Sequence, residues 1–122
     1  MKVLLGIGGT DGSVDALDRT VARAAEAGDD LTVAIVDSDD ADANREELAD
    51  RVEATVADTE LSVDVRHVEG VPGSELVDIA ETEAFDEIVL GGSTTSPMGK
   101  ITLNQTAEFV LLNSHVTVTL VR

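Results

Sequence analysis

The sequence contains no cysteine, no tryptophan and no tyrosine, and it has only two phenylalanines. Without cysteine, disulfides and thiolate metal sites are excluded. The shortage of aromatic side chains argues against recognition of single-stranded nucleic acid, because that recognition depends on stacking between bases and aromatic rings. No apolar run approaches the roughly 18 residues of a membrane-spanning helix. The first apolar stretch is also too short for a signal peptide, so we expect a cytoplasmic protein without membrane contacts.

Basic residues are scarce as well. Eight lysines and arginines stand against 25 aspartates and glutamates, which gives a formal net charge of −17. Nucleic acids and anionic membranes are bound through basic surfaces, so we expect neither as a partner. The 43% of hydrophobic residues recur periodically, which predicts a folded rather than a disordered chain. At molar ionic strength the Debye length falls to about 3 Å and screens the self-repulsion, so we interpret the composition as adaptation to a halophilic cytoplasm.

Segments typical of strands alternate with segments typical of helices along the chain. Apolar runs predict strands at residues 3–7, 31–36, 61–68 and 87–90, and a last strand that starts near residue 116. Apolar residues at helical spacing predict helices at about residues 13–27, 40–58 and 74–82, and a fourth that starts near residue 103. Gly28 stands where a helix ends, and residues 70–73 form a predicted turn.

This alternation predicts an α/β fold of one domain, residues 1–122, in which helices cover both faces of a doubly wound, Rossmann-like parallel sheet of five strands. Ligands of such sheets bind beyond the carboxyl ends of the strands. Here those ends lie at about residues 8–10, 36–38 and 91. If the last strand lies at an edge of the sheet, residues 118–121 present an apolar edge that a second copy of the chain would cover.

The segment from Gly91 to Lys100 is rich in glycine and hydroxyl side chains, and it connects a strand to a helix. That arrangement is typical of a phosphate site, because glycine lets backbone N–H groups approach an anion at the positive end of a helix. The Walker A motif does not fit, since Thr94 occupies its first glycine position and Ile101 follows the lysine. Lys100 either contacts a phosphate or is a solvated loop lysine, and both interpretations stay open.

A second glycine-rich segment, residues 6–11, fails as a dinucleotide fingerprint because Asp11 stands at the third glycine position of GxGxxG. An aspartate cluster at residues 37, 39 and 40 has the hard oxygen ligands of a magnesium site. In a chain with 25 acidic residues such a cluster also arises by chance, and we expect no metal site.

No acid–base constellation stands out in the sequence. His67 and His115 have no obvious serine or cysteine partner, and we expect both to be structural. We therefore favour a protein without enzymatic activity. The alternative is a slow nucleotide hydrolase or transferase that uses the same crevice, with Asp11 and Asp37 as the candidates for a general base or metal ligand.

Three segments follow patterns that occur together in one protein family. Residues 7–17 are similar to V-D-G-S-x-x-S-x-x-A-L, residues 68–72 to a G-x-P turn before the third helix, and residues 88–108 to a final strand–loop–helix that includes S-P-x-G-K. On these segments the chain resembles the universal stress protein (UspA) family, including halophilic archaeal members. The resemblance implies the strand order 3-2-1-4-5, a stress-response role in the cytoplasm, and a homodimer through the last strand, residues 118–121.

The resemblance also implies an adenine nucleotide site, since ATP-binding members carry G-x2-G-x9-G-[ST] in this loop. Only Gly91 matches that pattern, because Thr94, Asn104 and Gln105 stand at the other three positions. In the first turn Gly8 replaces the family's acidic residue, which contacts the adenosine portion. The loss of that acceptor is worth on the order of 1–3 kcal/mol. We therefore expect weak or absent ATP binding, with magnesium only alongside the nucleotide.

By resemblance, the positions of the nucleotide site are Gly8, Ile35, Leu90, Gly91, Gly99, Lys100 and Thr106. Ile35 and Leu90 would line the adenine pocket, and Thr106 would offer its amide or hydroxyl group to a phosphate. Gly99 and Lys100 would compensate in part for the missing family residues.

Overall fold

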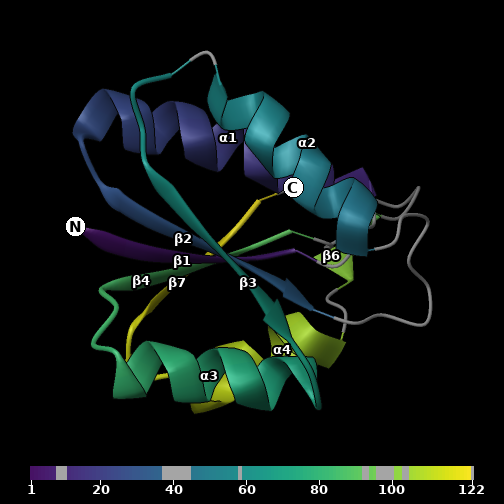
Figure 1. Cartoon of the computed structure of the whole chain (residues 1–122). Coiled ribbons are helices and arrows are strands. Elements are labelled where there is room, and N and C mark those ends of the chain that lie inside the picture. Colours follow the sequence, from purple (N-terminus) through teal and green to yellow (C-terminus); the bar gives the residue numbers. More distant parts are fainter. Residues whose placement is uncertain are drawn as a thin grey trace.

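The computed structural model describes residues 1–7, 11–36, 45–57, 59–91, 94–95, 101–102 and 105–121. Its centre is a parallel sheet of five strands in the order β3-β2-β1-β4-β7, which is the predicted order (Figure 1). The strands are β1 (Lys2–Ile7), β2 (Asp30–Val36), β3 (Val63–Val68), β4 (Glu87–Leu90) and β7 (Thr117–Leu120). The three central strands β2, β1 and β4 are buried along nearly their whole length, as their continuous apolar runs predict.

Helices cover both faces of this sheet. On one face lie α1 (Asp11–Ala27) and α2 (Arg45–Ala57), and on the other lie α3 (Pro72–Thr82) and α4 (Gln105–Asn113) (Figure 1). Side chains of successive strand residues point to opposite faces, so β1 contributes Val3 and Leu5 to the core beneath α1 and α2 and Leu4 to the core beneath α3 and α4. Complete burial of such a side chain stabilises the fold by about 1.5–3 kcal/mol.

Two glycines have distinct structural roles, one in the packing of α3 on β1 and one at the end of α1. A Cβ atom on Gly6 would lie 2.8 Å from Leu76 Cδ1, so the missing side chain lets α3 approach β1 closely. Gly28 has φ of 74°, and both its amide and that of Asp29 donate hydrogen bonds to the Ala24 carbonyl. This left-handed residue ends α1 where the sequence predicts the end.

The predicted strands and helices are confirmed, with boundaries that differ by a few residues. Helix α1 begins at Asp11 and α3 at Pro72, each two residues before the predicted start. Proline is favoured in a first helical turn because its fixed φ suits the helix and the missing N–H needs no partner there. The predicted turn at residues 70–73 is therefore shorter than expected. The expected start of the second helix, near residue 40, falls outside the described residues.

The segment after Gly91 contains two short strands that the sequence did not predict. Strands β5 (Thr94–Thr95) and β6 (Ile101–Thr102) pair antiparallel and form a small second sheet. Three of these four residues are threonine and the fourth is isoleucine, and β-branched residues favour extended backbone. Two-residue strands are too short to show an alternating pattern, which explains why the sequence did not predict them. Among the described helices, none has the length and apolar character that crossing a membrane requires.

Candidate functional site

The carboxyl edge of the sheet gathers the segments that the sequence assigns to ligand binding. Strands β1, β2 and β4 run parallel and end there at Ile7, Val36 and Leu90. Helix α1 begins after β1, and α4 begins after the β5–β6 hairpin, with β6 visible at this edge in Figure 1. The first turn of a helix has N–H groups that lack a partner within the helix and carries a partial positive charge, and both properties favour an anion. The edge therefore has the backbone layout of a phosphate site.

Ile35 and Leu90 lie near the ends of their strands, in register with Ile7 and Gly6 of β1. Their side chains are 0% and 2% exposed. They point to opposite faces of the sheet, because Ile35 belongs to the core under α1 and α2 and Leu90 to the core under α3 and α4. The structure thus brings the two residues to one edge without joining their side chains. The Leu90 carbonyl is occupied by a hydrogen bond of 2.8 Å from the Val121 amide.

Gly91 directly follows β4 and is half-buried, and Thr106 is half-buried in the first turn of α4. Both residues are therefore on elements that begin or end at the carboxyl edge. The other predicted site residues, Gly8, Gly99 and Lys100, lie outside the described residues.

The rival predictions also fall largely outside the described part of the chain. This holds for the aspartate cluster at residues 37, 39 and 40, which includes the candidate base Asp37. The backbone of Asp11 opens α1, whereas its side chain is not described. Among the residues that the structure does describe, no three histidine, aspartate or glutamate side chains gather in the manner of a metal site.

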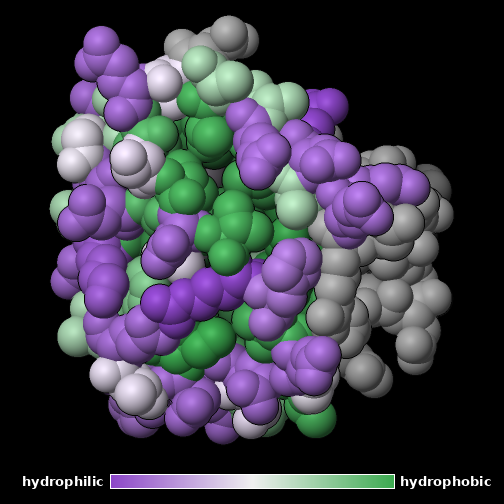
Figure 2. All heavy atoms as spheres, in the orientation of Figure 1, coloured by the Kyte–Doolittle hydropathy of each residue, from purple (hydrophilic) through white to green (hydrophobic). Residues whose placement is uncertain are grey.

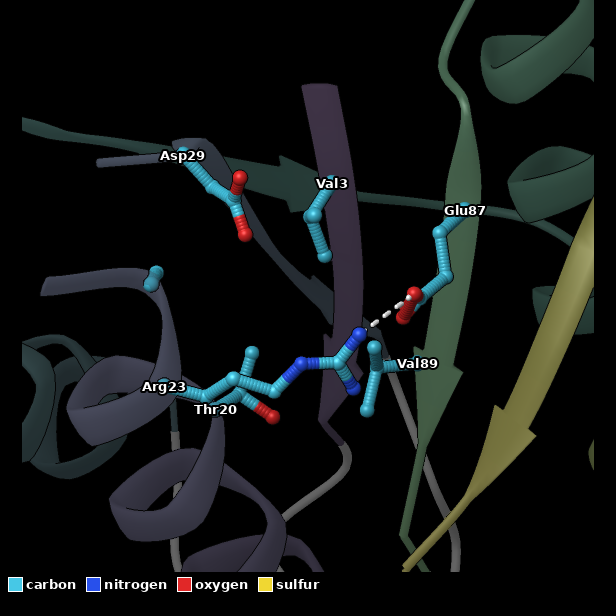
Figure 3. Close-up of a pocket in the computed structure, with 7 residues that line it drawn as sticks. Val3, Thr20, Arg23, Asp29, Glu87 and Val89 are labelled. Carbon is cyan, nitrogen blue, oxygen red and sulfur yellow. Dashed lines mark hydrogen bonds and ion pairs between the residues drawn. The ribbon is translucent and has the colours of Figure 1, made fainter. Parts of the chain in front are cut away.

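Sequence reasoning missed a polar cluster at the opposite, amino edge of the sheet. There a small pocket is lined by Val3, Thr20, Arg23, Ala24, Asp29, Glu87 and Val89 (Figure 3). The Arg23 guanidinium reaches from α1 and lies 3.1 Å from Oε1 of Glu87 on β4. The Thr119 hydroxyl of β7 donates to Oε2 of the same carboxylate over 3.3 Å. The Glu87 side chain is only 4% exposed, whereas that of Arg23 is 56% exposed.

This cluster has a structural explanation. A buried carboxylate is costly unless it is paired and hydrogen-bonded, and both Glu87 oxygens have partners. The three residues join α1, β4 and β7. The only hint in the sequence is the single acidic residue at the start of the apolar run at 87–90. Its partner Arg23 lies 64 positions away, so sequence spacing could not reveal the pair.

A second ionic cluster also lies near the amino edge. Arg66 of β3 pairs with Glu83, which follows α3. The hydrogen bond from Arg66 lowers the pKa of the Glu83 carboxyl, and the same bond raises the pKa of Arg66. Lys2 Nζ donates to the Glu83 carbonyl over 2.5 Å and lies 4.5 Å from the centre of the Phe85 ring. These contacts connect β1 and β3 with the segment that follows α3, so we interpret them as structural. The candidate ligand site is therefore the carboxyl edge.

Comparison with known proteins agrees with this architecture. The Lactobacillus plantarum universal stress protein UspA has 20% sequence identity and a TM-score of 0.75, and the match covers 100% of this chain and 97% of that one. A universal stress protein from Archaeoglobus fulgidus, solved in complex with dAMP, has 14% identity and a TM-score of 0.65, with 100% and 98% covered. At these identities the similarity establishes the fold.

Sequence comparison establishes the family. The universal stress protein MJ0531 of Methanocaldococcus jannaschii is 30% identical over 77 residues, which are 63% of this chain and 45% of that protein. The matched segment thus spans less than half of that relative's length. The sequence profile of the universal stress protein family matches residues 1–122. The chain therefore belongs to the universal stress protein family.

Proposed function

We propose that this protein is a cytoplasmic stress-response module that binds an adenine nucleotide weakly at the carboxyl edge of its sheet. The observation that carries the proposal is the convergence at this edge of three strand ends and the N-termini of α1 and α4. The A. fulgidus relative with the same fold was solved with dAMP, which supports an adenine nucleotide as the ligand class. The module would act through ligand sensing and partner binding, without catalysis.

In this proposal each predicted site residue has a role. Gly91 lets backbone N–H groups approach the ligand, and Thr106 in the first turn of α4 offers its hydroxyl or amide to a phosphate. By family resemblance Ile35 and Leu90 line the adenine pocket near the ends of β2 and β4, and their side chains are buried on opposite faces of the sheet. Gly8, Gly99 and Lys100 belong to the same site by family resemblance. Magnesium is bound only together with the nucleotide.

Calorimetric titration with AMP and with ATP plus magnesium, in molar potassium chloride, tests the proposal. We expect dissociation constants of roughly 0.1–1 mM, equivalent to about −4 to −5.5 kcal/mol. Thr106→Val keeps the side-chain shape and removes the hydroxyl, so it should weaken binding several-fold. Thr82→Val makes the same change at the exposed last residue of α3 and should leave binding unchanged. Absence of binding at millimolar nucleotide, or equal effects of the two variants, would contradict the proposal.

Gly8→Asp offers a gain of affinity as a second arm of the same experiment. It restores the acidic residue that ATP-binding family members carry in the first turn. A restored hydrogen bond of about 1–2 kcal/mol would tighten adenosine-nucleotide binding roughly 5–30-fold. Looser or unchanged binding by this variant would argue against an adenosine subsite at the end of β1.

We also propose that the protein is a homodimer joined through β7, at residues 118–121. Strand β7 is an edge of the sheet. Of the 25 acidic residues in the sequence, only Glu108 comes after Glu87. Pairing at this edge therefore keeps the acidic surfaces of two copies apart. Phe109 of α4 packs on Gly73 of α3. Leu111 is roughly 200° further around α4, so it lies on the flank away from α3, toward β7. Its side chain is 41% exposed.

Light scattering at high salt tests the dimer. Leu111→Glu places a charge beside the proposed seam and should produce monomers at micromolar concentration. Val71→Glu adds the same charge just before α3, at a residue that is 66% exposed, and should leave the dimer intact. A monomeric wild-type protein would refute this part of the proposal.

A further inference from the structure

The two edges of the sheet differ in chemistry. Strand β7 lies in residues 88–122, which contain a single acidic residue, Glu108, whereas β3 lies in the acidic remainder of the chain. Strand β3 pairs with β2 along all six residues, and within the described part of the chain no strand lies on its outer side. On that side the backbone N–H and C=O groups of β3 have no strand partner among the described residues, which makes the edge a template for adding another strand.

Side chains beside β3 supply an apolar surface as well. Leu61, Val63 and Val65 are half-buried and pack against the core under α1 and α2. Figure 2 views the molecule from the β3 side and shows apolar surface between the helical layers, crossed and rimmed by hydrophilic residues. An added strand that carries apolar residues at alternate positions would extend this surface.

The charges around β3 are mostly negative. Asp64 on the strand and Glu60 just before it are exposed. Arg51 of α2 pairs with Asp18 of α1, so Glu53, roughly 200° around the helix, lies on the other flank of α2, toward β3. Arg66 on the same strand is already neutralised by Glu83. These charges favour a basic segment at this edge.

We propose that the β3 edge binds an extended basic segment of a partner protein, which adds to the sheet as a sixth strand. Backbone hydrogen bonds would supply affinity, alternate apolar residues would pack beside Val63 and Val65, and lysines or arginines on the opposite face would lie beside Asp64. A second copy of the chain is the wrong occupant, because two β3 edges would bring like charges together. The inference rests on the chemistry of this edge and is independent of nucleotide binding.

The probe is a peptide of about eight residues in which lysine alternates with valine. Its binding is measured by fluorescence anisotropy at about 0.5 M potassium chloride, where salt screens the charge attraction only in part. We expect a dissociation constant of roughly 10–100 µM and slower hydrogen exchange of amides in Val63–Val68. The same peptide with alternate amides methylated keeps its charge and loses the ability to pair as a strand. It should bind at least tenfold more weakly.

Two charge variants complete the experiment. Asp64→Lys should weaken peptide binding about tenfold, whereas Asp15→Lys, at an exposed position of α1, makes the same change in net charge and should have little effect. Equal binding of the methylated peptide would show attraction by charge alone and overturn the proposal. So would equal effects of the two variants, or protection of the β3 amides by self-association without peptide.

Discussion

At the scale of single residues, the Arg23–Glu87 pair shows how unequal exposure sets the cost of losing a partner. The carboxylate is 4% exposed and the guanidinium 56% exposed. If Arg23 is removed, the carboxylate stays buried, and among the described residues only the Thr119 hydroxyl remains as its partner. If Glu87 is removed, water can solvate the guanidinium. The first loss should therefore be the more harmful one.

Arg23→Met is accordingly expected to lower the free energy of unfolding by about 2–4 kcal/mol, and Glu87→Met by less than about 1 kcal/mol. The double variant should recover most of the loss, because it leaves no buried charge. Denaturant unfolding in high salt gives these values. A larger loss for Glu87→Met than for Arg23→Met would contradict the role assigned to the buried carboxylate.

Ala84 offers a second test at this scale, since it is exposed and has φ of 55°. Left-handed backbone is unfavourable for residues with a Cβ atom and free of that cost for glycine. Ala84→Gly should therefore raise the free energy of unfolding by about 0.5–1 kcal/mol. Ala25→Gly, at an exposed position inside α1, should lower it by about 1 kcal/mol, and the same sign for both would refute the explanation.

At the scale of elements, the contact between Arg66 of β3 and Glu83 holds the edge strand to the end of α3. The pKa of Glu83 in the folded protein is lowered by this hydrogen bond. A group with a lowered folded pKa stabilises the protein fully above its unfolded pKa, near 4.5, and loses that contribution as the pH falls through the folded pKa. The pair of Arg66 and Glu83 therefore stabilises the folded protein at neutral pH and loses this contribution in acid.

Glu83→Gln should thus be less stable than the wild type at pH 7, and the difference should vanish under strongly acidic conditions. Unfolding curves of both proteins between pH 7 and about pH 2 measure the difference. A gap that persists or widens at low pH would show that the carboxylate does not stabilise this contact.

The same scale shows what the sequence could predict. Continuous apolar runs predict buried strands, and apolar residues at helical spacing predict amphipathic helices. The predicted strand order is confirmed. The β5–β6 hairpin was missed because two-residue strands have no readable period. The side chains of Ile35 and Leu90 are buried on opposite faces of the sheet, which depends on the register of their strands. The ion pair between Arg23 and Glu87 joins residues far apart in the sequence, so only the folded structure reveals it. Family resemblance indicates which residues belong to a site, whereas the direction in which each side chain points is known only from the folded structure.

At the scale of the whole molecule, the net charge of −17 is the dominant electrostatic feature. Self-repulsion of the acidic surface opposes compaction in dilute buffer and is screened when the Debye length falls to about 3 Å near 1 M salt. We expect the thermal midpoint of unfolding to rise steadily as potassium chloride increases from dilute to molar concentration. A midpoint independent of salt, or highest in dilute buffer, would contradict adaptation to high salt.

A crystal structure with AMP at saturating concentration tests the proposal that the carboxyl edge of the sheet binds an adenine nucleotide. The nucleotide is expected between the ends of β1 and β4, with its phosphate in hydrogen-bond contact with Thr106 or a neighbouring amide in the first turn of α4. Nucleotide density at another place, or none at the carboxyl edge under saturating conditions, would show that this edge is not an adenine nucleotide site.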